Sequence, residues 1–160
     1  MEDRINFSKV LSGATFGIEA FIVEIETHLE KAMLAFTIVG LPDNAVKESR
    51  ERVTAAIKNS GLKFPGKKIT INMAPADVKK EGSSFDLPIA VGILAADGFI
   101  PINQLQDTIF LGELSLDGTL RPIKGALPLA VCARDKGIKR LILPEDSVKE
   151  ASIVDGVEVY

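Results

Sequence analysis

Cysteine, histidine and tryptophan are scarce in this sequence. Its 160 residues include one cysteine, one histidine and no tryptophan. Cys132 alone can form neither an internal disulfide nor a cysteine metal cluster, which agrees with a reducing, cytoplasmic location. His28 has no second ligand in a metal-binding pattern, which favours an ordinary surface residue. We therefore expect a cytoplasmic protein without a metal site in this chain.

A basic excess and long apolar runs are also missing. The formal net charge is -3, whereas a free-standing duplex-binding domain neutralises phosphates with an excess of lysine and arginine. Any nucleic-acid contact by these residues must therefore be local or shared. The apolar runs are too short to span a bilayer, and residues 1–9 contain no apolar core of signal-peptide length. We expect neither a membrane partner nor a targeting segment.

The composition is typical of one soluble domain with an aliphatic core, because 46% of the residues are hydrophobic and only 6% are aromatic. Alternation and short apolar runs predict strands over residues 18–29, 33–39, 67–73, 109–114, 119–123, 139–143 and 157–160. Helical spacing of apolar residues predicts helices over residues 43–60, 87–96, 124–136 and 145–151. This order predicts a single α+β domain over residues 1–160, a two-layer sandwich of a mixed sheet and helices.

Local signals refine this prediction. The first two predicted strands are close in sequence, so we expect them to form a hairpin, with both faces of the second strand largely covered. Asp43 is the expected N-cap of the first helix, and Gly61 is its expected stop. Asp117-Gly118 predicts a second hairpin. The helix over residues 87–96 is almost wholly apolar and should lie in the core.

The loop before this apolar helix is the best candidate site. Backbone N–H groups in the first turn of a helix lack partners within it, so a loop with Ser and Asp side chains can cap the helix or bind an anion there; it can also present a serine nucleophile. We expect the loop to contact a neighbouring module, a subunit or DNA, with its lysines exposed to phosphates or carboxylates. The residues assigned to this contact are Lys79, Lys80, Glu81, Ser83, Ser84, Phe85 and Asp86.

Carboxylates in and beside this loop raise the question of a divalent-cation site. Asp77, Glu81 and Asp86 lie within ten residues of one another, and oxygen ligands suit Mg²⁺ and Ca²⁺. Helix caps and ion pairs with the loop lysines or with Arg121 explain the same residues with fewer assumptions. We therefore assign no metal ligand here.

Ordered motifs run through nearly the whole chain. They are Val39-Gly40-Leu41-Pro42, residues 45–53, residues 57–61, Phe64-Pro65, residues 72–77, residues 80–90, residues 112–118 and residues 121–125. In type and order they resemble the N-terminal domain of the Mg-chelatase-like ATPases of the YifB/ComM family. The resemblance implies that an AAA+ ATPase module follows Tyr160 in a longer protein.

The family resemblance also implies a function. The chain is expected to be a non-catalytic scaffold and assembly domain of a ring motor, a homo-hexamer that acts in DNA branch migration and recombination during natural transformation. Its expected partners are its own AAA+ module, neighbouring subunits and, through the full-length protein, DNA. ATP and Mg²⁺ are expected as cofactors of the AAA+ module and not of this chain, because the sequence lacks the Gly-x-x-x-x-Gly-Lys-[Ser/Thr] loop that binds phosphates.

The chain is also similar in plan to the proteolytic domain of Lon, which has the fold of the second domain of the small ribosomal subunit protein S-five. This resemblance places Ser84 at the nucleophile position and Leu127 at the position of the general-base lysine. Leu127 cannot accept a proton, so the alternative function, a Lon-like serine peptidase, needs a substitute base. Lys124, three positions earlier, and Lys79 or Lys80 in the loop are the candidates. Phe85 would crowd such a site, and the Asp86 carboxylate would oppose a developing oxyanion.

Overall fold

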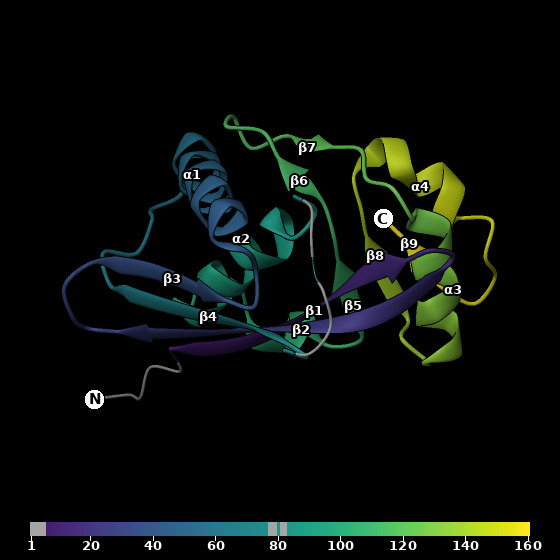
Figure 1. The fold of residues 1–160 in the computed structure, drawn as a ribbon, viewed down its shortest axis with the longest axis horizontal. Helices are drawn as coiled ribbons and strands as arrows, with labels where there is room; N and C mark the ends of the chain where they lie inside the picture. Colours follow the sequence, from purple (N-terminus) through teal and green to yellow (C-terminus); the bar gives the residue numbers. More distant parts are fainter. Residues whose placement is uncertain (1–5, 77–79, 81–82) are drawn as a thin grey trace.

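The computed structural model describes residues 6–76, 80 and 83–160 (Figure 1). The strands are β1 (Phe7–Phe16), β2 (Glu19–Glu30), β3 (Ala35–Val39), β4 (Lys68–Ala74), β5 (Thr108–Phe110), β6 (Glu113–Leu114), β7 (Leu120–Arg121), β8 (Arg140–Ile142) and β9 (Glu158–Val159). The helices are α1 (Asp43–Asn59), α2 (Asp86–Ala96), α3 (Ala126–Asp135) and α4 (Glu145–Ala151), with a 3-10 helix at Ile102–Leu105.

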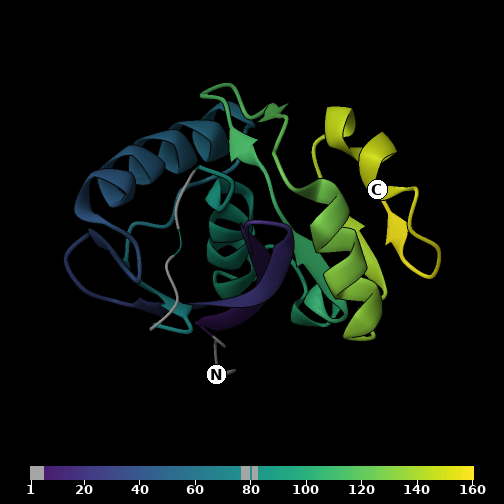
Figure 2. The same ribbon diagram turned by 45° about the vertical axis from the view of Figure 1, so that its right-hand side comes forward.

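One mixed sheet organises the fold. Its strands lie in the order β3-β4-β2-β1-β5-β8-β9, and β6 and β7 form a separate two-stranded sheet. The pairs β1/β2 and β2/β4 are antiparallel, and the remaining pairs of the large sheet are parallel. Helices α1 and α2 lie on one side of the sheet, and α3 and α4 lie toward its β8–β9 end (Figures 1 and 2). The predicted α+β fold of a mixed sheet layered with helices is confirmed.

Helix α2 lies at the centre of the core. Ile89 and Ile93 are fully buried on it, and Ile25 and Ile71 are fully buried on the sheet. Gly92 allows α2 to approach the sheet closely, because a Cβ atom there would lie 2.8 Å from Thr27 Oγ1. The prediction of a core helix over residues 87–96 is therefore confirmed.

Strand β1 was not predicted from the sequence. It pairs with β2 along its whole length, from Phe7 opposite His28 to Phe16 opposite Glu19. Its buried positions include Ser8 and Ser12, whose hydroxyls donate to the backbone carbonyls of Gly92 and Phe110 at 2.7 Å each. These hydrogen bonds allow the two serine side chains to be buried. Because serines occupy inward-facing positions, the sequence of β1 lacks the apolar alternation that marks a half-buried strand.

The hairpin predicted between residues 18–29 and 33–39 is wrong. Strand β4 lies between β2 and β3, and β3 pairs with β4 in parallel through the α1 crossover. Strand β3 is an edge strand in which only Ile38 is buried, so the prediction that both its faces are covered is also wrong. The short separation in sequence from β2 is misleading, because the β2–β3 connection, with exposed Met33 and Leu34, joins two strands that have β4 between them.

The local turn signals were mostly reliable. Gly61 follows α1 with a φ of 81°, a left-handed conformation that suits a helix stop. The hairpin at Asp117-Gly118 is confirmed as β6 and β7. Asp43 is not the N-cap of α1, because Pro42 occupies that position and the helix has no side-chain cap hydrogen bond.

Candidate functional site

Asp86, the first residue of α2, accepts hydrogen bonds from α1 and β6 and is 1% exposed. Arg52 Nε donates to Oδ2 at 2.6 Å, and Arg52 Nη2 donates to Oδ1 at 3.2 Å. Ser49 Oγ donates to Oδ1 at 2.8 Å. The backbone N–H of Leu114 donates to Oδ2 at 3.1 Å. Asp86 therefore joins α1, α2 and β6 and holds the entrance of α2 in place.

The pKa values of Asp86 and Arg52 are both shifted in the folded protein. Burial raises the pKa of the Asp86 carboxyl, while the hydrogen bonds from Arg52, Ser49 and Leu114 oppose that rise. The hydrogen bond to Asp86 raises the pKa of the Arg52 guanidinium. Four donors, two of them from the Arg52 guanidinium, hydrogen-bond to the two carboxylate oxygens, so the carboxylate is fully occupied by protein groups. Asp86 is thus an anchor of the fold.

The expected exposure of the loop lysines is wrong for Lys80, and Phe85 and Asp86 are buried beside it. Phe85 is 2% exposed and Lys80 is 3% exposed. Lys80 Nζ donates to the backbone carbonyl of Pro75, and Lys80 Cε lies 3.4 Å from the position that a Cβ atom of Gly40 would take. The turn at Gly40 therefore lies close against the Lys80 side chain. That the loop contacts a module, a subunit or DNA stays a prediction, and Asp77, Lys79 and Glu81 lie outside the described residues.

The backbone N–H groups in the first turn of α2 are already hydrogen-bonded within the protein. The N–H of Asp86 donates to the carbonyl of Ser83 at 3.2 Å, and the N–H of Leu87 donates to the carbonyl of Gly112 at 3.0 Å. Pro88 has no N–H group, and the N–H of Ile89 continues the helix by donating to Phe85. These donors already have partners. The hypothesis that this helix start binds an anion is therefore not supported.

Ser83 connects the loop to the β6–β7 hairpin. Its hydroxyl donates to Glu113 Oε1, and Glu113 Oε2 lies 3.6 Å from Arg121 Nε. Arg121 therefore pairs with Glu113 on the neighbouring strand. This arrangement gives the loop a second attachment beside the Asp86 network.

Ser84 and Lys124 line the same cavity, which has a volume of about 200 Å³. The cavity lies between the end of β1, the start of α2 and the segment before α3. Its lining residues are Gly13, Ala14, Thr15, Phe16, Ser84, Phe85, Leu111, Lys124 and Leu129. The two residues that the peptidase alternative requires thus line one cavity, although they are 40 positions apart in sequence.

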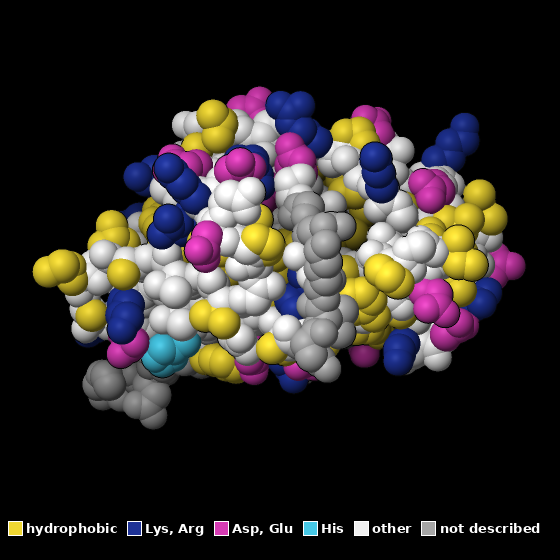
Figure 3. Space-filling view, in the orientation of Figure 1, with side chains coloured by type: hydrophobic (Ala, Val, Ile, Leu, Met, Phe, Trp, Pro, Cys, Tyr) yellow, Lys and Arg dark blue, Asp and Glu magenta, His cyan; other side chains and the backbone are white. Residues whose placement is uncertain are grey.

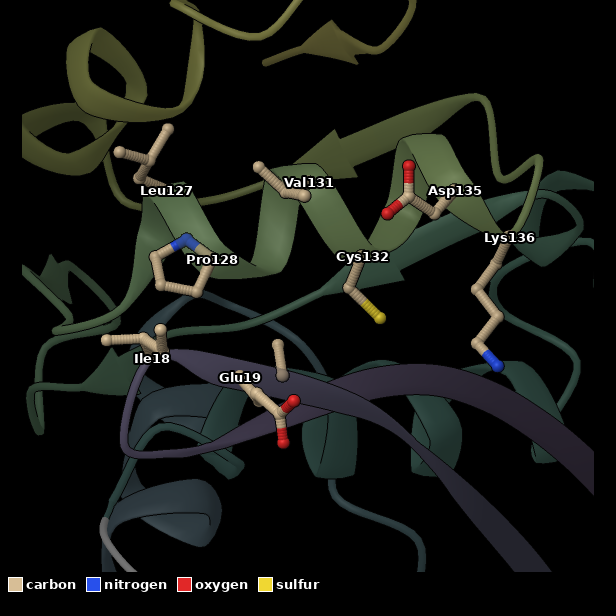
Figure 4. A pocket seen from close by; sticks show the side chains of 9 residues that line it. Ile18, Glu19, Leu127, Pro128, Val131, Cys132, Asp135 and Lys136 are labelled. Atoms are coloured by element: carbon tan, nitrogen blue, oxygen red, sulfur yellow. The ribbon is translucent and has the colours of Figure 1, made fainter.

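Leu127 lines a different groove, of about 660 Å³, between α3 and the β1–β2 turn. In Figure 4, Pro128 and Cys132 point from α3 toward the turn that carries Ile18 and Glu19. Leu127 lies at the outer end of this groove, and its N–H donates to Glu150 Oε2 of α4 at 2.9 Å. The position that the Lon resemblance assigns to the general base is thus outside the Ser84 cavity.

Single titratable residues outside this region have ordinary surroundings. His28 Nε2 lies 3.8 Å from Glu30 Oε2 on the surface. Burial raises the pKa of the half-buried Cys132 thiol. No cluster of three or more His, Cys, Asp or Glu side chains that could hold a metal ion occurs among residues 6–76, 80 and 83–160. In the same part of the chain, no helix is long and apolar enough to cross a membrane.

The exposed face of α1 carries both signs of charge. Lys and Arg side chains alternate with Asp and Glu side chains over this helix in Figure 3. Glu48 lies 3.8 Å from Arg52, as the helical spacing of four residues predicts. The face therefore has the character of a solvated helix surface and not of a phosphate-binding stripe.

Arg52 and Ser49 are the site residues that the sequence did not reveal. Sequence spacing pairs Arg52 with Glu48, whereas the shorter contact is with Asp86, 34 residues away. One signal was present, because Ser49 and Arg52 are three residues apart and share a helix face with the buried Val53. That signal shows that the two side chains face inward, but it does not name their partner.

Comparison with known proteins gives a consistent set of similarities. The family model described as subunit ChlI of Mg-chelatase matches residues 25–147. The competence protein ComM of Haemophilus influenzae is 44% identical over 151 residues, which cover 94% of this chain and 30% of that protein. The uncharacterized protein YifB of Escherichia coli is 42% identical over 152 residues, which cover 95% of this chain and 30% of that protein.

A weaker similarity reaches Lon. Lon protease 2 of Bacillus subtilis is 32% identical over 114 residues, which cover 71% of this chain and 20% of that protease. The chain thus spans less than a third of the length of each of these relatives. The Lon similarity supports the fold, in agreement with the mixed sheet and helices.

Proposed function

This chain belongs to the family of subunit ChlI of Mg-chelatase, and we propose that it is a non-catalytic scaffold and assembly domain of a YifB/ComM-like, ATP-dependent ring motor. One observation carries this proposal: the chain aligns over 94% of its own length with ComM but over only 30% of that protein. Most of such a relative therefore lies outside the region to which this chain corresponds. We assign ATP, Mg²⁺ and an AAA+ module to that remaining part of a longer protein.

The internal bonding of the domain supports a scaffold role. The Asp86 carboxylate joins α1, α2 and β6 through four hydrogen bonds, and the Ser83–Glu113 contact attaches the loop to the β6–β7 hairpin. Such a network holds backbone segments in one arrangement. A rigid domain can position neighbouring subunits without doing chemistry itself.

The wider role that we propose is DNA branch migration and recombination during natural transformation, carried out by a homo-hexamer in the cytoplasm. DNA contact is assigned to the full-length protein because this chain has a net charge of -3 and mixed charge on α1. The name of the similar ComM protein, a competence protein, supports the link to transformation.

A Lon-like serine peptidase is the second candidate, and one observation favours it: Ser84 and Lys124 line a common cavity. Two observations weigh against it. Leu127 lies outside that cavity, and the identity to ComM and YifB exceeds the identity to Lon. This alternative is therefore not favoured.

A deletion experiment in the full-length protein tests the assembly role. The intact protein is compared with a variant lacking the residues of this domain, and with a control in which an unrelated folded domain of similar size replaces them. Mass photometry reports ring formation, and ATP binding, ATP hydrolysis and branch migration of a four-way junction are measured in parallel. Loss of rings and of branch migration in both variants, with ATP binding retained, is the expected result. Normal rings and normal branch migration without the domain would contradict the proposal.

A further inference from the structure

Among the described residues that line the Ser84 cavity, Lys124 is the one charged residue, and it is exposed to solvent. Two hydroxyl-bearing residues, Ser84 and Thr15, line it as well, and Phe16, Leu111 and Leu129 supply apolar surface. Its lining thus combines a single cation, hydrogen-bond donors and an apolar wall. A cavity of about 200 Å³ is large enough for a side chain but not for a folded element.

We propose that this cavity binds a carboxylate of a peptide segment from a partner protein. The Lys124 ammonium would attract the carboxylate, the hydroxyls of Ser84 and Thr15 would donate to its oxygens, and an adjacent apolar side chain would contact the apolar wall. A lysine beside hydroxyl donors is chemically complementary to a carboxylate, and apolar lining gives such a site its remaining affinity. The inference is separate from the assembly role, because it concerns this domain alone.

The backbone around the cavity is held in place before any ligand binds. The carbonyl of Ser84 accepts a hydrogen bond from the N–H of Gly112 at 2.7 Å. Gly125, which follows Lys124, has a φ of 84°, and a Cβ atom there would lie 2.7 Å from Thr15 Cγ2. The segment that carries Lys124 therefore packs closely on the end of β1. Binding to such a preformed site requires little ordering of the protein.

A peptide carboxylate fits these observations better than a nucleic-acid phosphate. Nucleic-acid affinity comes from several cations that neutralise successive phosphates, whereas the lining residues that the structure describes include one charged residue, Lys124. The N–H groups of Asp86 and Leu87 at the nearby start of α2 are already bonded within the protein. The apolar wall formed by Phe16, Leu111 and Leu129 also suits a side chain next to the carboxylate.

Nuclear magnetic resonance titration of the ¹⁵N-labelled 160-residue chain tests the proposal. Two probes distinguish the sources of a carboxylate: acetyl-Leu-Glu-Leu-amide carries it on a side chain, and acetyl-Leu-Leu-Leu carries it at the chain end. The neutral acetyl-Leu-Gln-Leu-amide and inorganic phosphate are controls. At least one acidic peptide should shift the amide signals of Thr15, Ser84 and Leu111, and should bind more tightly than both controls.

Matched lysine variants complete the test. Lys124→Met should weaken binding of the acidic peptide about tenfold, because it removes the charge-assisted contact. Lys139→Met removes the same charge from an exposed lysine outside the cavity lining and should bind as the wild type does. Retained dispersion of the amide spectrum shows that both variants are folded. The proposal is overturned if neither acidic peptide shifts the cavity signals, if phosphate or the neutral peptide binds equally well, or if folded Lys124→Met binds like the wild type.

Discussion

Arg52 and Asp86 form a bidentate ion pair across 34 residues of sequence, with Nε–Oδ2 and Nη2–Oδ1 distances of 2.6 and 3.2 Å. The Asp86 side chain is 1% exposed and the Arg52 side chain is 22% exposed. The pair joins the middle of α1 to the start of α2. It therefore fixes the backbone that leads from Ser84 into the central helix.

Replacing Asp86 should destabilise the fold strongly. Asp86→Ala leaves the Ser49 hydroxyl, the Leu114 N–H and part of the Arg52 guanidinium without their partner, so we expect a loss of about 3 kcal/mol in the free energy of unfolding. Urea denaturation followed by circular dichroism measures this loss. Glu48→Ala is the matched control, because Glu48 lies 3.8 Å from the same arginine but is exposed; its effect should stay below about 1 kcal/mol. Equal effects of the two variants would show that the buried network is not an anchor.

Adding a methyl group at Gly92 should separate α2 from the sheet. The new Cβ atom would lie 2.8 Å from Thr27 Oγ1, 3.4 Å from Ser8 Oγ and 3.5 Å from Val10 Cγ2. Overpacking of this kind costs about 1–3 kcal/mol, which thermal unfolding would reveal as a lower melting temperature. Gly66→Ala is the control, because a Cβ atom at Gly66 would have no heavy atom within 4 Å. A melting temperature of Gly92→Ala at or above that of Gly66→Ala would contradict this packing.

The sequence predicted most elements because their signals are local. Gly61 and Gly137 stop α1 and α3 with left-handed backbones, and α4 spans the predicted residues Glu145–Ala151. Strand β1 escaped prediction because Ser8 and Ser12 occupy buried positions that depend on distant carbonyl partners. The order of the strands could not be predicted for a related reason. The local sequence of β3 does not specify that β4 lies between β3 and β2.

The candidate site shows the same division between local and distant information. The loop before α2 was found from its Ser and Asp residues, but the partner of Asp86 lies on α1. Burial of Lys80 depends on the approach of the turn at Gly40. The sequence around Lys80 does not indicate this contact, because Gly40 is 40 positions away. Likewise, the spacing of the Lon motif placed the base at Leu127, whereas the fold brings Lys124 to the Ser84 cavity.

The β6–β7 turn should stabilise the domain in a pH-dependent way. The backbone N–H and hydroxyl of Thr119 donate to Asp117 Oδ1 at 3.0 and 2.8 Å, and these bonds lower the pKa of the Asp117 carboxyl. A carboxyl whose pKa is lower in the folded state stabilises the fold above its unfolded pKa, and the stabilisation is lost as the pH falls through the folded pKa.

Asp117→Asn should therefore be less stable than the wild type at neutral pH, and this difference should shrink as the pH falls below about 4. Urea midpoints of both proteins across this range provide the measurement. Asp155→Asn removes another exposed carboxylate, outside the hairpin, and serves as the control. A difference for Asp117→Asn that stays constant with pH would show that the Thr119 hydrogen bonds do not depend on ionisation of Asp117.

The last prediction is that neither the wild type nor Leu127→Lys has peptidase activity. The Lon resemblance assigns the general base to position 127, but Leu127 lines the groove between α3 and the β1–β2 turn, apart from the cavity of Ser84. General-base transfer requires contact at about 3 Å or through one water. Because position 127 lines a different groove, we expect a lysine there not to reach the Ser84 hydroxyl. Casein degradation and labelling by a fluorophosphonate should stay at background in the wild type, Leu127→Lys and Ser84→Ala, with an active serine peptidase as the positive control. Labelling of the wild type that is lost in Ser84→Ala would instead identify Ser84 as a nucleophile, with Lys124 as the base to test next.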